Sequence, residues 1–222
     1  MNYFAHALRF LDDPYFVAGT GVPDWLSVAG RDVRIRRRHL AAAMVDAAPE
    51  DSRLLRGIQQ HLDDDAWFHE TRAFAELSLA LSAEARDVLV EPQGLRPAFL
   101  GHLLVEVLLD AALIVENPAR LEDYFRLLEA VDPDRVQEVV NWTAQRPTDR
   151  LAGMIRLFCR ERILSDYLDD GKLLRRLNQV MRRVGLAEMP EGFVGLLPAA
   201  RHLVERRKTE LLSPSSLAFP RR

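Results

Sequence analysis

Two segments of the chain carry metal-binding residue types at the same spacing. They are His61, Asp65 and His69 in the first segment and His102, Glu106 and Asp110 in the second. On an α-helix, a step of four residues advances about 40° around the axis and about 6 Å along it, so each set forms a ladder on one face. Two facing ladders would offer imidazoles and carboxylates along roughly 12 Å of helix. The spacing therefore predicts a site for two or more metal ions.

The second segment adds an argument from burial. From Leu100 to Val115 the chain reads LGHLLVEVLLDAALIV, and its strongly polar residues are the three of the ladder. A helix that is apolar on all sides is typical of a protein core. An unpaired carboxylate there is costly, so these acids must be protonated, paired with a basic side chain or bound to a metal. A buried salt-bridge network with a hydrogen-bonded core histidine is the alternative, but the repeated spacing favours metal.

Helices must position these residues. The hydrophobic periodicity predicts an all-α fold without convincing strands, with one domain over residues 1–212, a soft boundary near residue 146 and a flexible tail over 213–222. A loop with Gly19, Gly21 and Pro23 is expected before a short helix from Asp24 to about Gly30. The other expected helices cover residues 3–11, 32–48, 49–89 with the first ladder, the apolar segment after Pro92 and Pro97, 119–130, 133–145, 149–168, 171–185 and 193–212.

Composition limits the classes of protein. The chain has 222 residues, of which 48% are hydrophobic and 28% charged, with a net charge of −3. This balance predicts neither a nucleic acid nor an anionic membrane as partner. The single cysteine, Cys159, excludes a disulfide framework within the chain and a thiolate zinc cluster. The first residues do not resemble a signal peptide, and no apolar run is expected to span a bilayer. A cytoplasmic protein of open oligomeric state is expected.

Single residues outside the ladders allow two interpretations each. His6 is either a metal ligand or a hydrogen-bonded core histidine, and Asp24 is either a ligand or the N-cap of a helix that begins at Trp25. The arginine-rich run 34–38 is a solvated face or a surface for an acidic partner. Asp63 and Asp64 are excluded from the site because their helical angles point elsewhere.

The residues together resemble a known family. Met1-Asn2-Tyr-Phe-Ala5-His6, then Asp24, then Gly57-Ile58-x-x-His61-x-x-x-Asp65 are similar to the bacterial acyl carrier protein phosphodiesterases. Those are helical, HD-domain-like metal hydrolases that remove phosphopantetheine from the carrier protein. Their later helix carries acids four apart, like Glu106 and Asp110. The order of ligands also resembles the zinc-dependent phospholipase C and nuclease group.

The resemblance covers roughly residues 1–115 and implies a ligand set and a fold. The implied fold is an HD-domain-like or phospholipase C-like helical bundle. The phosphodiesterase pattern adds Asp110 to the ligands of the phospholipase pattern, which are His6, Asp24, His61, Asp65, His69, His102 and Glu106. The chain departs from the phosphodiesterases at His69, where they have an acid, and at His102, where they have no histidine.

These observations predict a metal-dependent phosphoric ester hydrolase. Mixed nitrogen and oxygen ligands without sulfur suit zinc, manganese or iron, with two or more ions expected. Asp65 and Asp24 are the expected catalytic carboxylates, and the substrate is a phosphoester, free or carried on a protein. The alternative is a non-catalytic helical metal-binding or interaction protein that retains a relict site, with the arginines of 34–38 as its partner-binding face.

Overall fold

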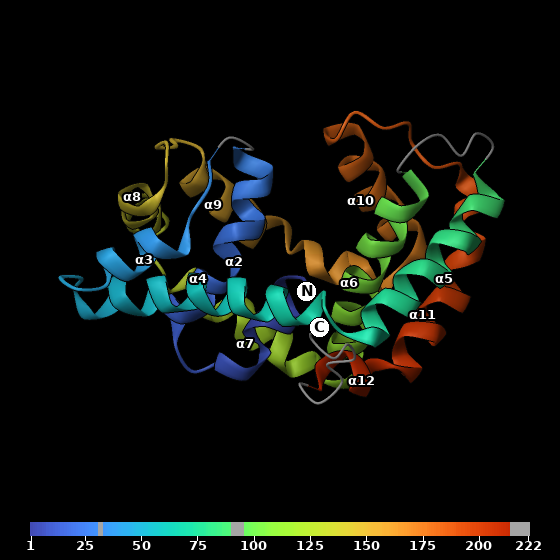
Figure 1. Ribbon diagram of the computed structural model, residues 1–222, viewed down its shortest axis with the longest axis horizontal. Coiled ribbons are helices and arrows are strands. Elements are labelled where there is room, and N and C mark those ends of the chain that lie inside the picture. Colours follow the sequence, from blue (N-terminus) through green and yellow to red (C-terminus); the bar gives the residue numbers. More distant parts are fainter. Residues whose placement is uncertain (31–32, 90–95, 214–222) are drawn as a thin grey trace, which may run out of the picture. The chain divides into compact units, whose positions relative to one another are not determined.

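The all-α prediction is confirmed. A computed structural model describes residues 1–30, 33–89 and 96–213, and these residues form helices and no strand (Figure 1). Their only bridge-type pairing is an isolated antiparallel one between Ile35 and Ala144. The helices are α1 Tyr3–Ala7, α2 Pro14–Ala29, α3 Arg37–Ala43, α4 Pro49–Phe68, α5 Arg72–Val88, α6 Arg96–Glu116, α7 Pro118–Glu129, α8 Pro133–Thr143, α9 Leu151–Glu161, α10 Asp170–Arg183, α11 Leu197–Arg206 and α12 Lys208–Leu212, with 3₁₀ helices η1 Leu8–Phe10, η2 Ile163–Leu168 and η3 Glu191–Leu196.

The chain divides into two compact units that alternate along the sequence. The His6 unit consists of Asn2–Asp65 and Asn117–Arg162. The α6 unit consists of Met1, Ala66–Glu116 and Ile163–Arg222. One division falls inside helix α4, between Asp65 and Ala66. The boundary expected near residue 146 lies within the His6 unit, and the expected tail, apart from Ser213, lies outside the described residues.

Aromatic side chains form the core of the His6 unit. The ring of Trp25 on α2 lies 5.4 Å from that of Phe158 on α9, and the ring of Phe4 on α1 meets Tyr124 on α7 edge-on at 6.0 Å. All four side chains are buried. Edge-to-face pairs of this kind add to the free energy gained by burying the rings. They hold the short helix α1 in place, although five residues alone would not remain helical in water.

The loop predicted around Gly19 is wrong, because residues 14–29 form one helix. The glycines serve a close crossing with α4. A Cβ on Gly19 would lie 2.2 Å from the carbonyl oxygen of Leu54, and a Cβ on Gly57 would lie 2.2 Å from that of Phe16. Only glycine permits this approach. Pro23 is tolerated inside the helix, where it removes one backbone donor.

The α6 unit is built around its apolar helix. Helix α6 packs against α5, α11 and η2, and Gly101 allows the contact with α5, since a Cβ there would lie 2.2 Å from the carbonyl oxygen of Ser78. The expectation that no segment could span a bilayer is wrong for Pro97–Glu116, which is long and apolar enough by length and composition. Most of this segment is buried in the structure, and the core helix of a globular protein has the same length and composition.

Among the helix boundaries that differ from the prediction, two have a clear cause. The expected helix over 49–89 is interrupted after Phe68, where the Thr71 hydroxyl donates to the Phe68 carbonyl at 2.8 Å and accepts from the Phe74 N–H at 3.2 Å. This single side chain ends α4 and caps α5. The expected basic helix over 32–48 is limited to Arg37–Ala43, because Ile35 is extended and pairs with Ala144.

Candidate metal centres

A first group of three ligand side chains lies within the His6 unit. It consists of His6 from α1 and of His61 and Asp65 from α4. Nε2 of His6 is 3.3 Å from Oδ1 of Asp65, and Nε2 of His61 is 3.4 Å from Oδ2 of the same carboxylate. The two imidazole rings stack with their centroids 3.9 Å apart. Two nitrogens therefore converge on one carboxylate from two helices.

Both imidazoles are oriented through their other ring nitrogen. Nδ1 of His61 lies 2.7 Å from the carbonyl oxygen of Thr20, which can only accept, so this nitrogen carries the proton. Nδ1 of His6 donates likewise to Oδ2 of Asp64 at 3.3 Å. Each Nε2 is then available as a ligand atom, and this arrangement is typical of metal-binding histidines.

Asp64 is not one of the three ligand residues of the first group, but it holds one of them in place. Asp64 is buried, and besides His6 it contacts Nη2 of Arg9 at 2.8 and 3.0 Å and Nε2 of Gln60 at 2.8 Å. Sequence reasoning could have included it. Residues at i+3 and i+4 share one helix face, so Asp64 follows His61 on nearly the same side as Asp65. Asp63 points away as predicted and pairs with Arg37.

Burial and charge shift the pKa values of this group. Burial alone would lower the pKa of His6, but the carboxylates of Asp64 and Asp65 outweigh it and raise the pKa to about 9. For Asp64 and Asp65, burial would raise the pKa, while the hydrogen bonds and charges around them, first of all His6, lower it. The group thus attracts a positive charge: a proton on His6 or a cation between the ligands.

The residues of the first group fit a divalent transition metal. Nε2 of His6 is fully buried, and it faces Oδ1 of Asp65 at 3.3 Å without good hydrogen-bond geometry. Coordination to a metal ion between these two atoms would satisfy the buried nitrogen better than this loose contact does. Two imidazoles and one carboxylate are a donor set that zinc, manganese and iron accept. The Asp65 side chain is 32% exposed, so the group is open to solvent on its carboxylate side.

A second group of three lies within the α6 unit. It consists of His69, His102 and Glu106. Nε2 of His69 lies 2.9 Å from Oε1 of Glu106, and Nε2 of His102 lies 3.3 Å from the same atom. Phe74 packs against both imidazole rings at 4.8 and 4.9 Å. This group is more open, since the two histidine side chains are 33% and 43% exposed.

The Glu106 carboxylate of the second group also meets the amino group of Met1, at 3.2 Å from Oε1. Burial would raise the pKa of Glu106, but the positive amino group and the two imidazoles lower it below its ordinary range. A metal ion here would compete with the ammonium group for this oxygen.

The predicted ladders are thus divided differently in the structure. His61 and Asp65 join His6, whereas His69 follows the end of α4 and joins His102 and Glu106.

Comparison with known proteins gave no match. No protein-family model, no curated protein and no solved structure matches it. The geometry of the side chains therefore carries the functional argument.

Two predicted site residues belong to neither group of described residues. Asp24 is half-buried inside α2, so it is not the N-cap of a helix starting at Trp25. Asp110 is fully buried on α6 and remains outside the second group, although it lies one helical turn beyond Glu106. Arg72, close to His69 in sequence, pairs with Glu76 on its own helix.

Proposed function

We propose that the chain is a metal-dependent hydrolase of phosphoric esters, with His6, His61 and Asp65 as its principal metal ligands. The observation that carries the proposal is the orientation of the two buried imidazoles. Thr20 and Asp64 occupy their Nδ1 atoms, so both Nε2 atoms face one partly exposed carboxylate. A catalytic metal site keeps such an open side, whereas a structural site is closed by protein ligands.

Each residue of the group has a chemical role in this proposal. His6 and His61 supply neutral nitrogen donors, and Asp65 supplies an oxygen donor and negative charge. Asp64 holds the ring of His6, and Arg9 in turn neutralises Asp64. A divalent ion bound there would lower the pKa of a bound water and neutralise charge on the phosphoryl oxygens. Zinc, manganese and iron all suit the donor set.

The choice of a phosphoric ester rests on the resemblance in the first 115 residues. The substrate class includes free phosphoesters and phosphoesters carried on a protein. The second group, His69, His102 and Glu106, would hold a further ion. Asp24 and Asp110 lie outside these two groups, and Asp24 would serve as the base.

Elemental analysis by plasma mass spectrometry tests the metal part of the proposal. We expect two classes of site: His61→Ala should remove metal from the first group and Glu106→Ala from the second, each leaving the other occupied. Circular dichroism controls for loss of the helical fold. Absence of transition metal from the purified and the zinc-reconstituted protein would refute it.

Turnover of phosphodiester and phosphomonoester substrates tests the reaction. Asp65→Ala should abolish hydrolysis while the helical content is retained, and Glu76→Ala, an exposed acid outside both groups, should leave it unchanged. Full turnover in the Asp65→Ala variant would show that Asp65 is not needed for hydrolysis and would refute its assignment as a ligand of the catalytic metal.

A closed, non-catalytic metal site is the second candidate, because the imidazoles of His6 and His61 are almost completely buried. Cobalt substitution separates the two. Inorganic phosphate should change the visible spectrum of bound cobalt if a coordination position is open, and should leave it unchanged if the site is structural.

A further inference from the structure

An open groove lies on the His6 unit, apart from both metal groups. It has a volume of about 820 Å³ and is bordered by helices α3 and α8, which contact each other (Figure 1). Its lining residues are His39, Ala42, Ala43, Asp46, Ala47, Trp142, Ala144 and Gln145. We call it the α3–α8 groove. Nothing in the proposed hydrolysis uses it.

Backbone contacts fix the walls of the α3–α8 groove. Ile35 pairs with Ala144, and the Gln145 N–H donates to the carbonyl of Arg34 at 3.2 Å. Nδ1 of His39 donates to the carbonyl of Thr143 at 3.1 Å. The two walls are therefore joined at several points, and the groove is formed before any ligand arrives. A preformed site loses little conformational entropy on binding.

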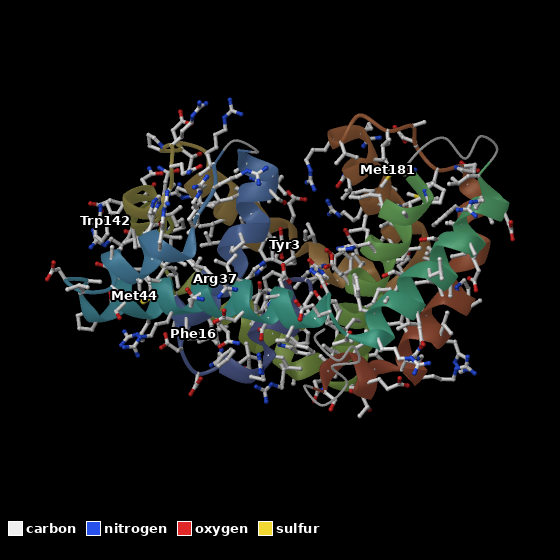
Figure 2. The ribbon with its side chains drawn as sticks, viewed as in Figure 1. Tyr3, Phe16, Arg37, Met44, Trp142 and Met181 are labelled. Carbon is white, nitrogen blue, oxygen red and sulfur yellow. The ribbon has the colours of Figure 1, made fainter. Side chains whose placement is uncertain are left out.

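The surface inside the groove is apolar and has one large anchor. Four of its lining residues are alanines, whose short side chains leave the space open. Trp142, labelled in Figure 2, is half exposed at 50%, and the guanidinium of Arg135 lies 4.8 Å from its ring centre. Val45, next to the lining residue Asp46, is 78% exposed. Exposed tryptophan on a preformed surface is typical of protein-binding sites.

Positive charge surrounds this apolar surface. Arg38 donates from Nε to Nε2 of His39 at 3.2 Å. With the side-chain amide of Gln145 turned so that its oxygen faces Arg36, this oxygen accepts from Nε and Nη2 of Arg36 at 2.8 and 3.0 Å. Arg34, which is also exposed, meets Gln145 through its backbone carbonyl. Asp46 is the only acid in the lining. The rim is thus cationic on a chain whose net charge is −3.

We propose that the α3–α8 groove binds an acidic amphipathic helix of a partner protein. Its apolar side chains would pack on Trp142 and the alanines, and its carboxylates would meet Arg34, Arg36 and Arg38. Helix-in-groove recognition uses this combination of an apolar floor and a complementary rim. A nucleic acid fits less well, because Asp46 and the alanines offer nothing to a phosphate backbone.

Fluorescence anisotropy with synthetic probes tests this proposal on the full chain. The probes are two labelled helical peptides of equal length and equal leucine pattern, one with glutamate and one with lysine at its polar positions, and a labelled single-stranded oligouridine. We expect the glutamate peptide to bind at least about tenfold more tightly than the lysine peptide, and the difference to shrink as salt is added. Equal binding of the two peptides, no binding of either, or preference for the oligouridine would overturn the proposal.

Variants locate the binding. The double replacement Arg36→Glu and Arg38→Glu should weaken binding of the glutamate peptide at least about tenfold, and Trp142→Ala should weaken binding of both peptides. The matched control reverses two arginines outside the groove, Arg126→Glu and Arg160→Glu, which are 75% and 73% exposed. Near-ultraviolet circular dichroism verifies folding. An equal loss in the control would mean that overall charge, and not the groove, attracts the peptide. Metal removal should leave the affinity unchanged.

Discussion

Among single residues, Asp64 distinguishes an organised metal site from a chance cluster. It is buried, binds no ion in our assignment, and orients His6 through Nδ1. We expect Asp64→Asn to weaken zinc binding by the first group about 10–100-fold, since the partner of a ligating histidine contributes about this much. Competition with a coloured chelator measures it. Asp63→Asn changes an adjacent exposed acid and should have no effect. Equal affinities in both variants would contradict the role of Asp64.

The protonation of His6 predicts how zinc binding depends on pH. Its pKa of about 9 lies above the ordinary value of 6.5, so the metal-free protein carries a proton there at neutral pH. Zinc must displace this proton, and its affinity should therefore rise up to about tenfold per pH unit between about pH 7 and 9. Calorimetry in two buffers of different ionisation enthalpy should detect about one released proton. Affinity that is constant over this range would exclude His6 as a ligand.

The raised pKa of His6 has the opposite consequence for the stability of the metal-free protein, which should fall where zinc affinity rises. A raised histidine pKa stabilises the folded state below the unfolded pKa, and this stabilisation is lost as pH rises through about 9. The pKa values of Asp64 and Glu106 are lowered in the folded protein, so their carboxylates stabilise the fold at pH values above the pKa of the unfolded state. This stabilisation is lost on acidification. Stability of the metal-free protein should thus be greatest between these two limits.

At the scale of elements, the crossing of α2 and α4 determines the position of His61. A methyl group on Gly19 would lie 2.2 Å from the Leu54 carbonyl oxygen and would push the helices apart. We expect Gly19→Ala to lower the free energy of unfolding by about 1–3 kcal/mol and to weaken zinc binding, because the Thr20 carbonyl moves away from His61. Urea denaturation measures the first effect.

Gly153 provides the matched control for this prediction. It also lies within a helix, α9, but a Cβ there meets nothing within 4 Å. Gly153→Ala should therefore raise the free energy of unfolding by up to about 1 kcal/mol, through helix propensity alone. If both replacements have the same sign, the close crossing is not what requires glycine at position 19.

Sequence periodicity predicts a helix well where its side chains alternate between core and solvent. It predicts poorly where a single contact determines where the helix ends. The i, i+4 pairs His61–Asp65 and His102–Glu106 each lie on one helix and each share a group. The extension to His69 failed because Thr71 ends the helix by hydrogen bonds that periodicity does not reflect. Gly19 suggested a loop because spacing along the chain carries no information about the helix that crosses there.

The ligand sets of the two metal groups could be predicted from the sequence only in part. His6 joins His61 across 55 positions of sequence. From its own segment His6 could be a ligand or a core histidine, and only the resemblance to a family grouped it with His61. Asp64, by contrast, could have been found from helical geometry. The assignment of ligands to two groups depends on how the chain divides into units, and no local pattern contains that information.

At the scale of the whole molecule, the two segments of the His6 unit must both be present for its core to form. Helices α7 and α9 supply Tyr124 and Phe158 to the rings of Phe4 and Trp25. We expect a fragment of residues 1–116 to lack a fixed core and a fragment of residues 1–162 to retain the buried environment of Trp25. Near-ultraviolet circular dichroism compares them. Equal spectra would mean that the second segment is dispensable.

The alternation of the two units along the chain also determines the order in which their segments are synthesised. A ribosome delivers residues 2–65 early, but their packing partners, residues 117–162, emerge only after the whole first segment of the α6 unit. That segment includes the apolar helix α6, whose own partner α11 is made later still. Newly made chain therefore holds exposed apolar surface for most of its synthesis, and chaperone dependence during translation should exceed that of a protein with two consecutive domains.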